Sequence, residues 1–249
     1  MKVLILGDSH SMYFSLNNEL KQINESFRGV NIKVLSIPGS TILGFGKRSS
    51  TLNSRDFFIK ELISFKPDFI CFALGQVDIE LGFFYRKVVK KEDLNIFDYV
   101  SMLIAAYLNS VENIQNEFGM PDSSICFKGI NISVLTSSRE KAVEYTSRII
   151  NENIEDSELK LKHHDDLAAT YPSNLERYRN HMYFNEVLNG AVKNRYKYFD
   201  INDVIKCPNV LGVCRLEFIP SKKDHHLLDS LFMRELYIRR LLSTCLNLL

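Results

Sequence analysis

This 249-residue sequence lacks several features that would assign it to a class at once. Its net charge of only +1 gives no excess of the kind that nucleic acids or anionic membranes attract. No apolar run approaches the length of a membrane span, and the run from Val3 to Leu6 is too short for the core of a signal peptide. We therefore expect a cytoplasmic protein that binds neither nucleic acid nor membranes.

Paired cysteines, repeats and nucleotide-binding fingerprints are also missing. The five cysteines are scattered and form no Cys-x-x-Cys pair, so we expect buried thiols in a reducing compartment instead of zinc or redox chemistry. Gly44-Phe-Gly46 lacks the lysine and the spacing of a phosphate-binding loop. The sequence therefore predicts no cofactor and no metal. What remains, 45% hydrophobic and 24% charged residues, is the composition of an ordinary globular protein.

The first eleven residues predict a buried strand that runs into a tight turn. Apolar residues precede Gly7, and the polar residues Asp8 to Ser11 lead into an amphipathic stretch with helical spacing. In an open α/β sheet, the carboxyl end of a strand faces the ligand crevice. Ser9 is thus predicted at this crevice, although Asp and Ser are also common helix caps and the turn alone does not distinguish the two interpretations.

Alternating strand and helix patterns continue along the chain. Further strands are predicted at 31–37, 69–74, 124–134 and 196–199, and longer helices at 97–118, 174–194 and 227–249. Strands that are apolar on both faces and alternate with helices indicate a parallel sheet covered on both sides. The prediction is a single α/β domain over residues 1–249, a three-layer α/β/α sandwich with a mainly parallel five-stranded sheet of the flavodoxin-like kind.

The segment 137–172 is more polar than the rest of the chain. We predict a helix over 140–151, then a solvated loop that contains His163-His-Asp-Asp166. Because the segment has too few apolar residues for its own core, it is interpreted as an insertion over the crevice edge or a solvated excursion, and not as a separate domain. Arg177 and Arg179 are interpreted as part of a charged helix face.

Several blocks, taken in order, resemble the SGNH (GDSL-like) hydrolase superfamily. They are Gly7-Asp-Ser-His10, Gly39, Gly75-Gln-Val-Asp78 and a histidine block near the end of the chain. A middle stretch is similar to SGNH-type proteins of bacterial polysaccharide biosynthesis loci: Arg177, Phe184-Asn185, Leu188 and Tyr198-Phe-Asp-Ile201. The resemblance implies the same fold and a serine nucleophile.

The resemblance also implies roles for individual residues. Ser9 is the nucleophile, and the N–H groups of Ser9 and Gly39 are donors of the oxyanion hole. The family's third donor is an asparagine, but Val77 occupies its position, and the neighbouring amide of Gln76 is the local substitute. Asp8 and Asp78 are expected to support these loops.

The last block departs from the family's Asp-x-x-His spacing. The chain reads Ser221-Lys-Lys-Asp-His-His-Leu227, so the residue three before His226 is Lys223 and the residue three before His225 is Lys222. We predict His226 as the base, with Asp224 reaching it through a bent loop and His225 as the alternative base. A Ser–His dyad without an acidic partner is the other arrangement that the spacing allows.

Three functions are compatible with these blocks. The resemblance implies a serine esterase or an O-acyltransferase that acts on a small acyl ester, such as acetyl, of a saccharide through an acyl-enzyme on Ser9. The departures favour a degenerate SGNH-fold protein that binds a glycan or a partner. A metallophosphoesterase would use Asp8-Ser-His10 with His225 and His226 as ligands, but its further motifs are missing from the sequence.

Overall fold

The structure is a computed structural model that describes residues 1–47, 51–135, 138–222 and 224–246. Its centre is a five-stranded sheet in the order β2-β1-β3-β4-β5, and every pairing is parallel. The strands are β1 (Lys2–Gly7), β2 (Asn31–Ser36), β3 (Phe69–Ala73), β4 (Ile125–Lys128) and β5 (Lys197–Phe199). The prediction of a parallel five-stranded α/β fold is confirmed.

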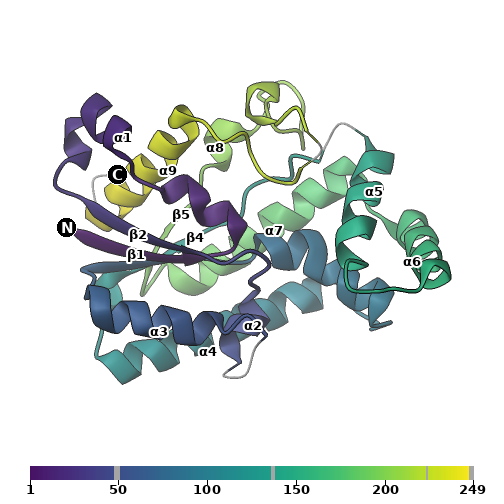
Figure 1. The fold of residues 1–249 in the computed structure, drawn as a ribbon, viewed down its shortest axis with the longest axis horizontal. Helices are drawn as coiled ribbons and strands as arrows, with labels where there is room; N and C mark the ends of the chain where they lie inside the picture. Colours follow the sequence, from purple (N-terminus) through teal and green to yellow (C-terminus); the bar gives the residue numbers. More distant parts are fainter. Residues whose placement is uncertain (48–50, 136–137, 223, 247–249) are drawn as a thin grey trace.

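Helices cover both faces of the sheet (Figure 1). They are α1 (Asn18–Ile23), α2 (Ile42–Gly46), α3 (Ser54–Phe65), α4 (Ile96–Phe118), α5 (Arg139–Ile150), α6 (Ser157–Thr170), α7 (Asn174–Val192), α8 (Asn202–Ile205) and α9 (Leu231–Leu246). Leu4 and Leu6 of β1 pack into the core beneath α2, α3, α4 and α7, whereas Val3 and Ile5 face the core beneath α9. This alternation follows from the two-residue period of a strand. Among the helices of the described residues, none combines the length and apolarity needed to cross a bilayer.

The helical stretch predicted after the first strand is divided in two. Ser9–Phe14 forms a 3₁₀ helix, and α1 starts only at Asn18. The break occurs because the Asn17 side chain accepts a hydrogen bond from the N–H of Leu20 and so caps a new helix. Ser9 therefore lies at the start of a short, tight turn of helix directly after β1.

The fourth strand ends earlier than the predicted 124–134, because β4 stops at Lys128. Beyond it, side-chain amides replace the partner strand: Asn185 accepts from the N–H of Ile130, and Asn202 accepts from the N–H of Ile132. The backbone groups of this segment are thus satisfied without a strand ladder.

The predicted insertion contains two helices, and the solvated loop at 162–166 is wrong. These residues belong to α6, which starts where the Asp156 carboxylate accepts from the N–H groups of Glu158 and Leu159. Apolar side chains of α5 and α6, including Val143 and Leu167, join the core cluster of the main sheet. Gly44 and Gly46, which lie outside any element predicted from the sequence, belong to the short helix α2, capped by Thr41.

The closing helix also differs from its prediction, since α9 starts at Leu231 and not at Leu227. Leu227 is buried in the preceding loop, and its carbonyl oxygen accepts a hydrogen bond from Tyr13 Oη at 2.6 Å. This contact ties the last block of the chain to the helical turn that carries Ser9.

Candidate active site

The end of β1 presents the hydroxyl of Ser9. Gly7 is required where the strand enters the turn, because a Cβ there would lie 2.5 Å from Ser11 Cβ and 2.8 Å from the carbonyl oxygen of Ala73. Asp8 then caps the turn: its buried carboxylate accepts from the N–H of His10 at 2.9 Å. Ser9 is half-buried at the first position of this turn.

Ser9, His226 and Asp224 form a continuous chain of hydrogen bonds. Ser9 Oγ lies 2.7 Å from His226 Nε2, and His226 Nδ1 lies 2.7 Å from Asp224 Oδ1. The same carboxylate oxygen accepts from the backbone N–H of His225 at 2.6 Å and of His226 at 3.3 Å. This tight bend brings an aspartate only two residues before the histidine into the orienting position.

The electrostatics of Asp224 fit that position. Its partial burial alone would raise the pKa of the carboxyl, but the hydrogen bond from His226 and the positive charges that His226 and His225 can carry lower it below its ordinary value. Asp224 is therefore ionised across the neutral range. Lys223, the residue at the family's acidic position, lies outside the described residues.

His225 belongs to a second carboxylate–histidine pair. Its Nδ1 lies 3.0 Å from Glu80 Oε2, and both side chains are buried. Burial alone would raise the pKa of Glu80, yet the hydrogen bond and the charge of His225 lower it to about 2, and Glu80 in turn raises the pKa of His225. Sequence reasoning missed Glu80, for which the available signal was an acidic residue between the apolar Ile79 and Leu81.

His10 completes a group of three histidine rings. Its ring stacks on that of His226 at 4.3 Å between centroids, its Nδ1 lies 3.0 Å from Asp8 Oδ1, and its Nε2 lies 3.3 Å from the carbonyl oxygen of His225. Each of the three histidines offers a nitrogen within 4.8 Å of the others, so they are a conceivable cation site among the described residues. Because a metal binds in the plane of an imidazole ring, the stacked rings of His10 and His226 do not point at one ion in this arrangement.

Two backbone donors are available for an oxyanion. Gly39 has a φ of 75°, in the left-handed region that glycine adopts most readily. Among the described residues, the N–H groups of Ser9 and Gly39 have no hydrogen-bond partner. The role of these two N–H groups as oxyanion donors stays a prediction.

The third donor suggested by the sequence is engaged elsewhere. Gln76 Oε1 accepts from the N–H of Asn131 at 2.7 Å, and Gln76 Nε2 donates to the carbonyl oxygen of the same residue at 3.1 Å. The structure thus uses the Gln76 amide to join the loop after β3 to the segment after β4. Gln76 is not brought into the hydrogen-bond chain of Ser9.

Asp8 and Asp78 hold the loops of the site together. Asp8 Oδ2 accepts from the N–H of Val77 at 3.4 Å, and Asp78 Oδ2 accepts from the N–H of Ile42 at 3.0 Å. The loops after β1, β2 and β3 are thereby linked in pairs by buried carboxyl groups.

Other polar residues that the sequence singled out have structural partners. His163, interpreted as solvated, is buried with its Nδ1 2.7 Å from Asn151 Oδ1, and Asp166 pairs with Lys91 at 2.6 Å. Arg177 does not lie on an exposed helix face, since it is buried and donates to the carbonyl oxygen of Leu135.

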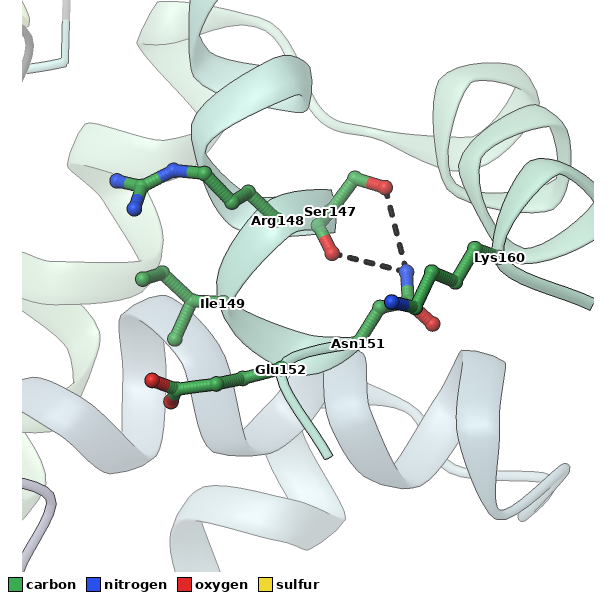
Figure 2. Close-up of a pocket in the computed structure, with 6 residues that line it drawn as sticks. All are labelled: Ser147, Arg148, Ile149, Asn151, Glu152 and Lys160. Carbon is green, nitrogen blue, oxygen red and sulfur yellow. Dashed lines mark hydrogen bonds between the residues drawn. The ribbon is translucent and has the colours of Figure 1, made fainter. Parts of the chain in front are cut away.

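A cavity of about 310 Å³ lies beside α5 and the start of α6. Figure 2 shows the six lining residues, among which Asn151 Nδ2 donates to the carbonyl oxygen of Ser147 at 2.8 Å and contacts its Oγ at 3.3 Å. None of the six is a histidine that could activate Ser147. The candidate active site is therefore the Ser9 group.

An all-parallel sheet in this order, with helices on both faces, is the α/β fold of SGNH-like proteins. Solved structures of SGNH and GDSL-like esterases match over nearly the full chain. A catalytic mutant of Axe2, an acetylxylan esterase from Geobacillus stearothermophilus, is 13% identical with a TM-score of 0.51, over 98% of this chain and 93% of that chain.

Two further structures are similar over all or nearly all of their length. TesA is 13% identical with a TM-score of 0.48 over 100% of both chains. The psychrotrophic esterase EstA from Pseudoalteromonas sp. is 11% identical with a TM-score of 0.44, over 99% of this chain and 97% of that chain. No family model and no curated protein matches the sequence. At such identities the similarity shows the fold.

Proposed function

We propose that the protein is a serine esterase or O-acyltransferase that forms an acyl-enzyme on Ser9. The observation that carries this proposal is the unbroken contact from Ser9 Oγ to His226 Nε2 and from His226 Nδ1 to Asp224 Oδ1, each 2.7 Å. A serine hydroxyl becomes a strong nucleophile only beside such a base. The match of the fold to SGNH-like esterases supports a hydrolase.

In the proposed mechanism each of these groups has one step. His226 Nε2 takes the proton of Ser9 Oγ as the oxygen attacks the ester carbonyl carbon, while Asp224 holds the Nδ1–H tautomer and stabilises the imidazolium. The N–H groups of Ser9 and Gly39 donate to the oxyanion. The imidazolium then returns the proton to the departing alcohol, which leaves the acyl group on Ser9.

The second half-reaction repeats these steps with a new nucleophile. Water would release the acid, and the hydroxyl of an acceptor would instead carry the acyl group away. His226 accepts the proton of either nucleophile and returns it to Ser9 Oγ, so the same residues serve esterase and transferase chemistry.

The proposed substrate is a small acyl ester, such as acetyl, of a saccharide. The acetylxylan esterase with the matching fold and the stretch from Arg177 to Ile201, which resembles proteins of polysaccharide loci, support this choice. The five cysteines are all free, which supports a reducing compartment such as the cytoplasm.

Replacement of Ser9 tests the proposal. Ser9→Ala should lower kcat for acetyl-ester hydrolysis by at least about a thousandfold, because the variant has no nucleophile. The melting temperature should stay nearly unchanged, because among the described residues Ser9 Oγ has a hydrogen bond only to His226. Unaltered activity in the variant would exclude this mechanism.

A binding protein without turnover is the second candidate, because the Gln76 amide is engaged with Asn131 and leaves the oxyanion hole with two donors. A fluorophosphonate probe distinguishes the two. Labelling of the wild type but not of Ser9→Ala identifies an activated serine, whereas no labelling of either protein favours the binding protein.

A further inference from the structure

A cavity of about 540 Å³ opens next to the loops of the active site. Its lining includes Ser40, Asp78, Tyr85, Tyr99, Lys47 and Lys90. Ser40 directly follows Gly39, and Asp78 binds the N–H of Ile42 at 3.0 Å. The cavity is therefore built on the same loops that supply the proposed oxyanion donor, and its volume is that of a small-ligand pocket.

An unsatisfied polar group marks the inner wall of the cavity. Ser40 is 1% exposed, and its Oγ has no hydrogen-bond partner among the described residues. Leaving a buried hydroxyl unpaired costs free energy, so such a group indicates a partner that enters the cavity. Asp78, also 1% exposed, lines the same cavity, and its carboxyl is a second polar group there.

Aromatic rings provide apolar surface in the same cavity. Tyr85 is 38% exposed, and Tyr99 is buried at the start of α4. A tyrosine offers an apolar ring face together with a polar hydroxyl. Rings of this kind suit a ligand that has flat apolar patches and many hydroxyl groups, as a sugar ring has.

The charge of the cavity is positive at its rim. Arg86 and Glu92 both line it and neutralise each other in an ion pair of 2.7 Å. Within the described parts of the chain, Lys47 and Lys90 have no carboxylate partner. The Nζ of Lys90 lies 5.5 Å from the centroid of the Tyr85 ring, so a cation stands beside the exposed aromatic face.

We infer that this cavity binds a saccharide that bears an acidic group, with the sugar ring against Tyr85, its hydroxyls toward Ser40 and Asp78, and its acid toward Lys47 and Lys90. The inference rests on the proposed function, because the sugar is the part of the substrate that carries the ester cleaved at Ser9. A carboxylate and a phosphate share the required charge, and the experiment separates them.

Binding to the Ser9→Ala variant tests the cavity without any turnover. Calorimetry would compare glucuronate, glucose 6-phosphate and neutral glucose. We expect one or both acids to bind at least about tenfold more tightly than glucose, with an advantage that weakens at high salt, since charge pairing is screened by ions. The tighter of the two acids identifies the acidic group.

Charge-removing variants locate the effect. In the Ser9→Ala background, Lys47→Gln combined with Lys90→Gln should reduce the ratio of acid to glucose affinity to near one. Lys60→Gln, which removes an exposed lysine of α3 outside the cavity, should keep the ratio of the parent. The inference would be overturned if the ratio of acid to glucose affinity were near one in the Ser9→Ala parent. It would also be overturned if Lys60→Gln lowered that ratio as much as the double substitution does.

Turnover by the wild type tests the esterase proposal and the cavity inference separately. The ratio of kcat/KM for O-acetyl glucuronate and O-acetyl glucose 6-phosphate to that for O-acetyl glucose should reach about ten for the preferred acid. If none of these esters nor p-nitrophenyl acetate is cleaved, the esterase proposal fails while the binding result still decides the cavity. If the esters are cleaved with no preference for either acidic sugar over glucose, the inference about the cavity is overturned but the esterase proposal is not.

Discussion

Asp224 accepts hydrogen bonds from four donors with one oxygen atom. Its Oδ1 accepts from the N–H groups of His225 and His226, from His226 Nδ1 and, at 3.4 Å, from Tyr145 Oη, so the carboxylate shapes the loop and holds the ring at once. The adjacent histidines therefore contact different carboxylates: His226 contacts Asp224, and His225 contacts Glu80.

This arrangement predicts the order of damage on substitution. His226→Ala should lose nearly all activity, about a thousandfold or more in kcat, and Asp224→Asn about a hundredfold, because the base is retained but its tautomer is no longer fixed. Lys223→Ala should have little effect. Steady-state kinetics on one acetyl ester would give the order, and greater damage in His225→Ala than in His226→Ala would reverse the assignment.

The residues of the candidate site show which contacts could be predicted from the sequence and which could not. The contacts of His226 with Ser9 and Asp224 agree with the arrangement that the family's blocks suggested, although the sequence also allowed His225 as the base and a Ser–His dyad. The catalytic roles of these residues stay a prediction. The pairing of Glu80 with His225 was not predicted, because 145 residues separate them and neither occurs in a spacing that signals contact.

A second residue-scale prediction concerns Asp78. Burial raises its pKa to about 7, above the 3.8 of an exposed aspartate, and the Asp8 carboxylate contributes to the rise. The folded protein thus holds this proton more tightly than the unfolded chain does. Ionisation of Asp78 therefore costs stability progressively as the pH rises from about 4 to 7, by up to about 1.4 kcal/mol per pH unit.

Asp78→Asn should consequently increase the free energy of unfolding at pH 8, and the increase should shrink at pH 5, while the amide oxygen keeps the bond to the N–H of Ile42. Urea denaturation at the two pH values measures this. Asp56→Asn, at an exposed position of α3, is the control and should show no such pH dependence. An equal gain at both pH values would contradict the raised pKa.

At the scale of elements, the passage from β1 to its helical turn depends on Gly7. A methyl group there would collide with Ser11 Cβ and the Ala73 carbonyl oxygen, and both lie in segments that cannot move independently of the site. We expect Gly7→Ala to destabilise the protein by about 1–3 kcal/mol. Gly29→Ala, where nothing lies within 4 Å of the added atom, should change stability by less than about 0.5 kcal/mol in the same thermal or urea unfolding assay.

Element types were more predictable than element ends. Apolar periodicity identified the five strands, because a strand buried on both faces has few polar residues. The early end of β4 was hidden, because its continuation is bonded to the side chains of Asn185 and Asn202 and remains as apolar as a strand. The helix over 162–166 was missed because its polar composition resembles that of a loop, although Asp156 marks its start.

For the whole molecule, the buried pair of Glu80 and His225 connects the segment after β3 to the end of the chain. Glu80, with a pKa lowered to about 2, contributes stability above about pH 4.5 that is lost as the pH falls toward 2. His225, whose pKa is raised, contributes stability below about pH 6.5 that is lost as the pH rises through its folded value. The pair therefore contributes most to the free energy of unfolding between about pH 4.5 and 6.5.

Glu80→Gln should lower the free energy of unfolding by about 3–5 kcal/mol at pH 5.5, because it leaves a buried histidine without its carboxylate. The loss should be smaller at pH 3 and at pH 9. Denaturant titrations at the three pH values would show that the loss of unfolding free energy is largest at pH 5.5. Glu155→Gln, at an exposed position, should show no such maximum. A loss that does not vary with pH would indicate a packing defect in place of a lost ion pair.

The separation of Ser9 and His226 by 217 residues also affects when the two residues are synthesised. A ribosome that adds about 5–20 residues per second incorporates the serine roughly 11–43 s before the histidine. During that interval the growing chain contains the proposed nucleophile but not its proposed base, and α9, which packs against the turn of Ser9, has not yet been synthesised. If Ser9 and His226 act together as proposed, the chain becomes reactive only when its last segment arrives, and translation itself delays the first turnover.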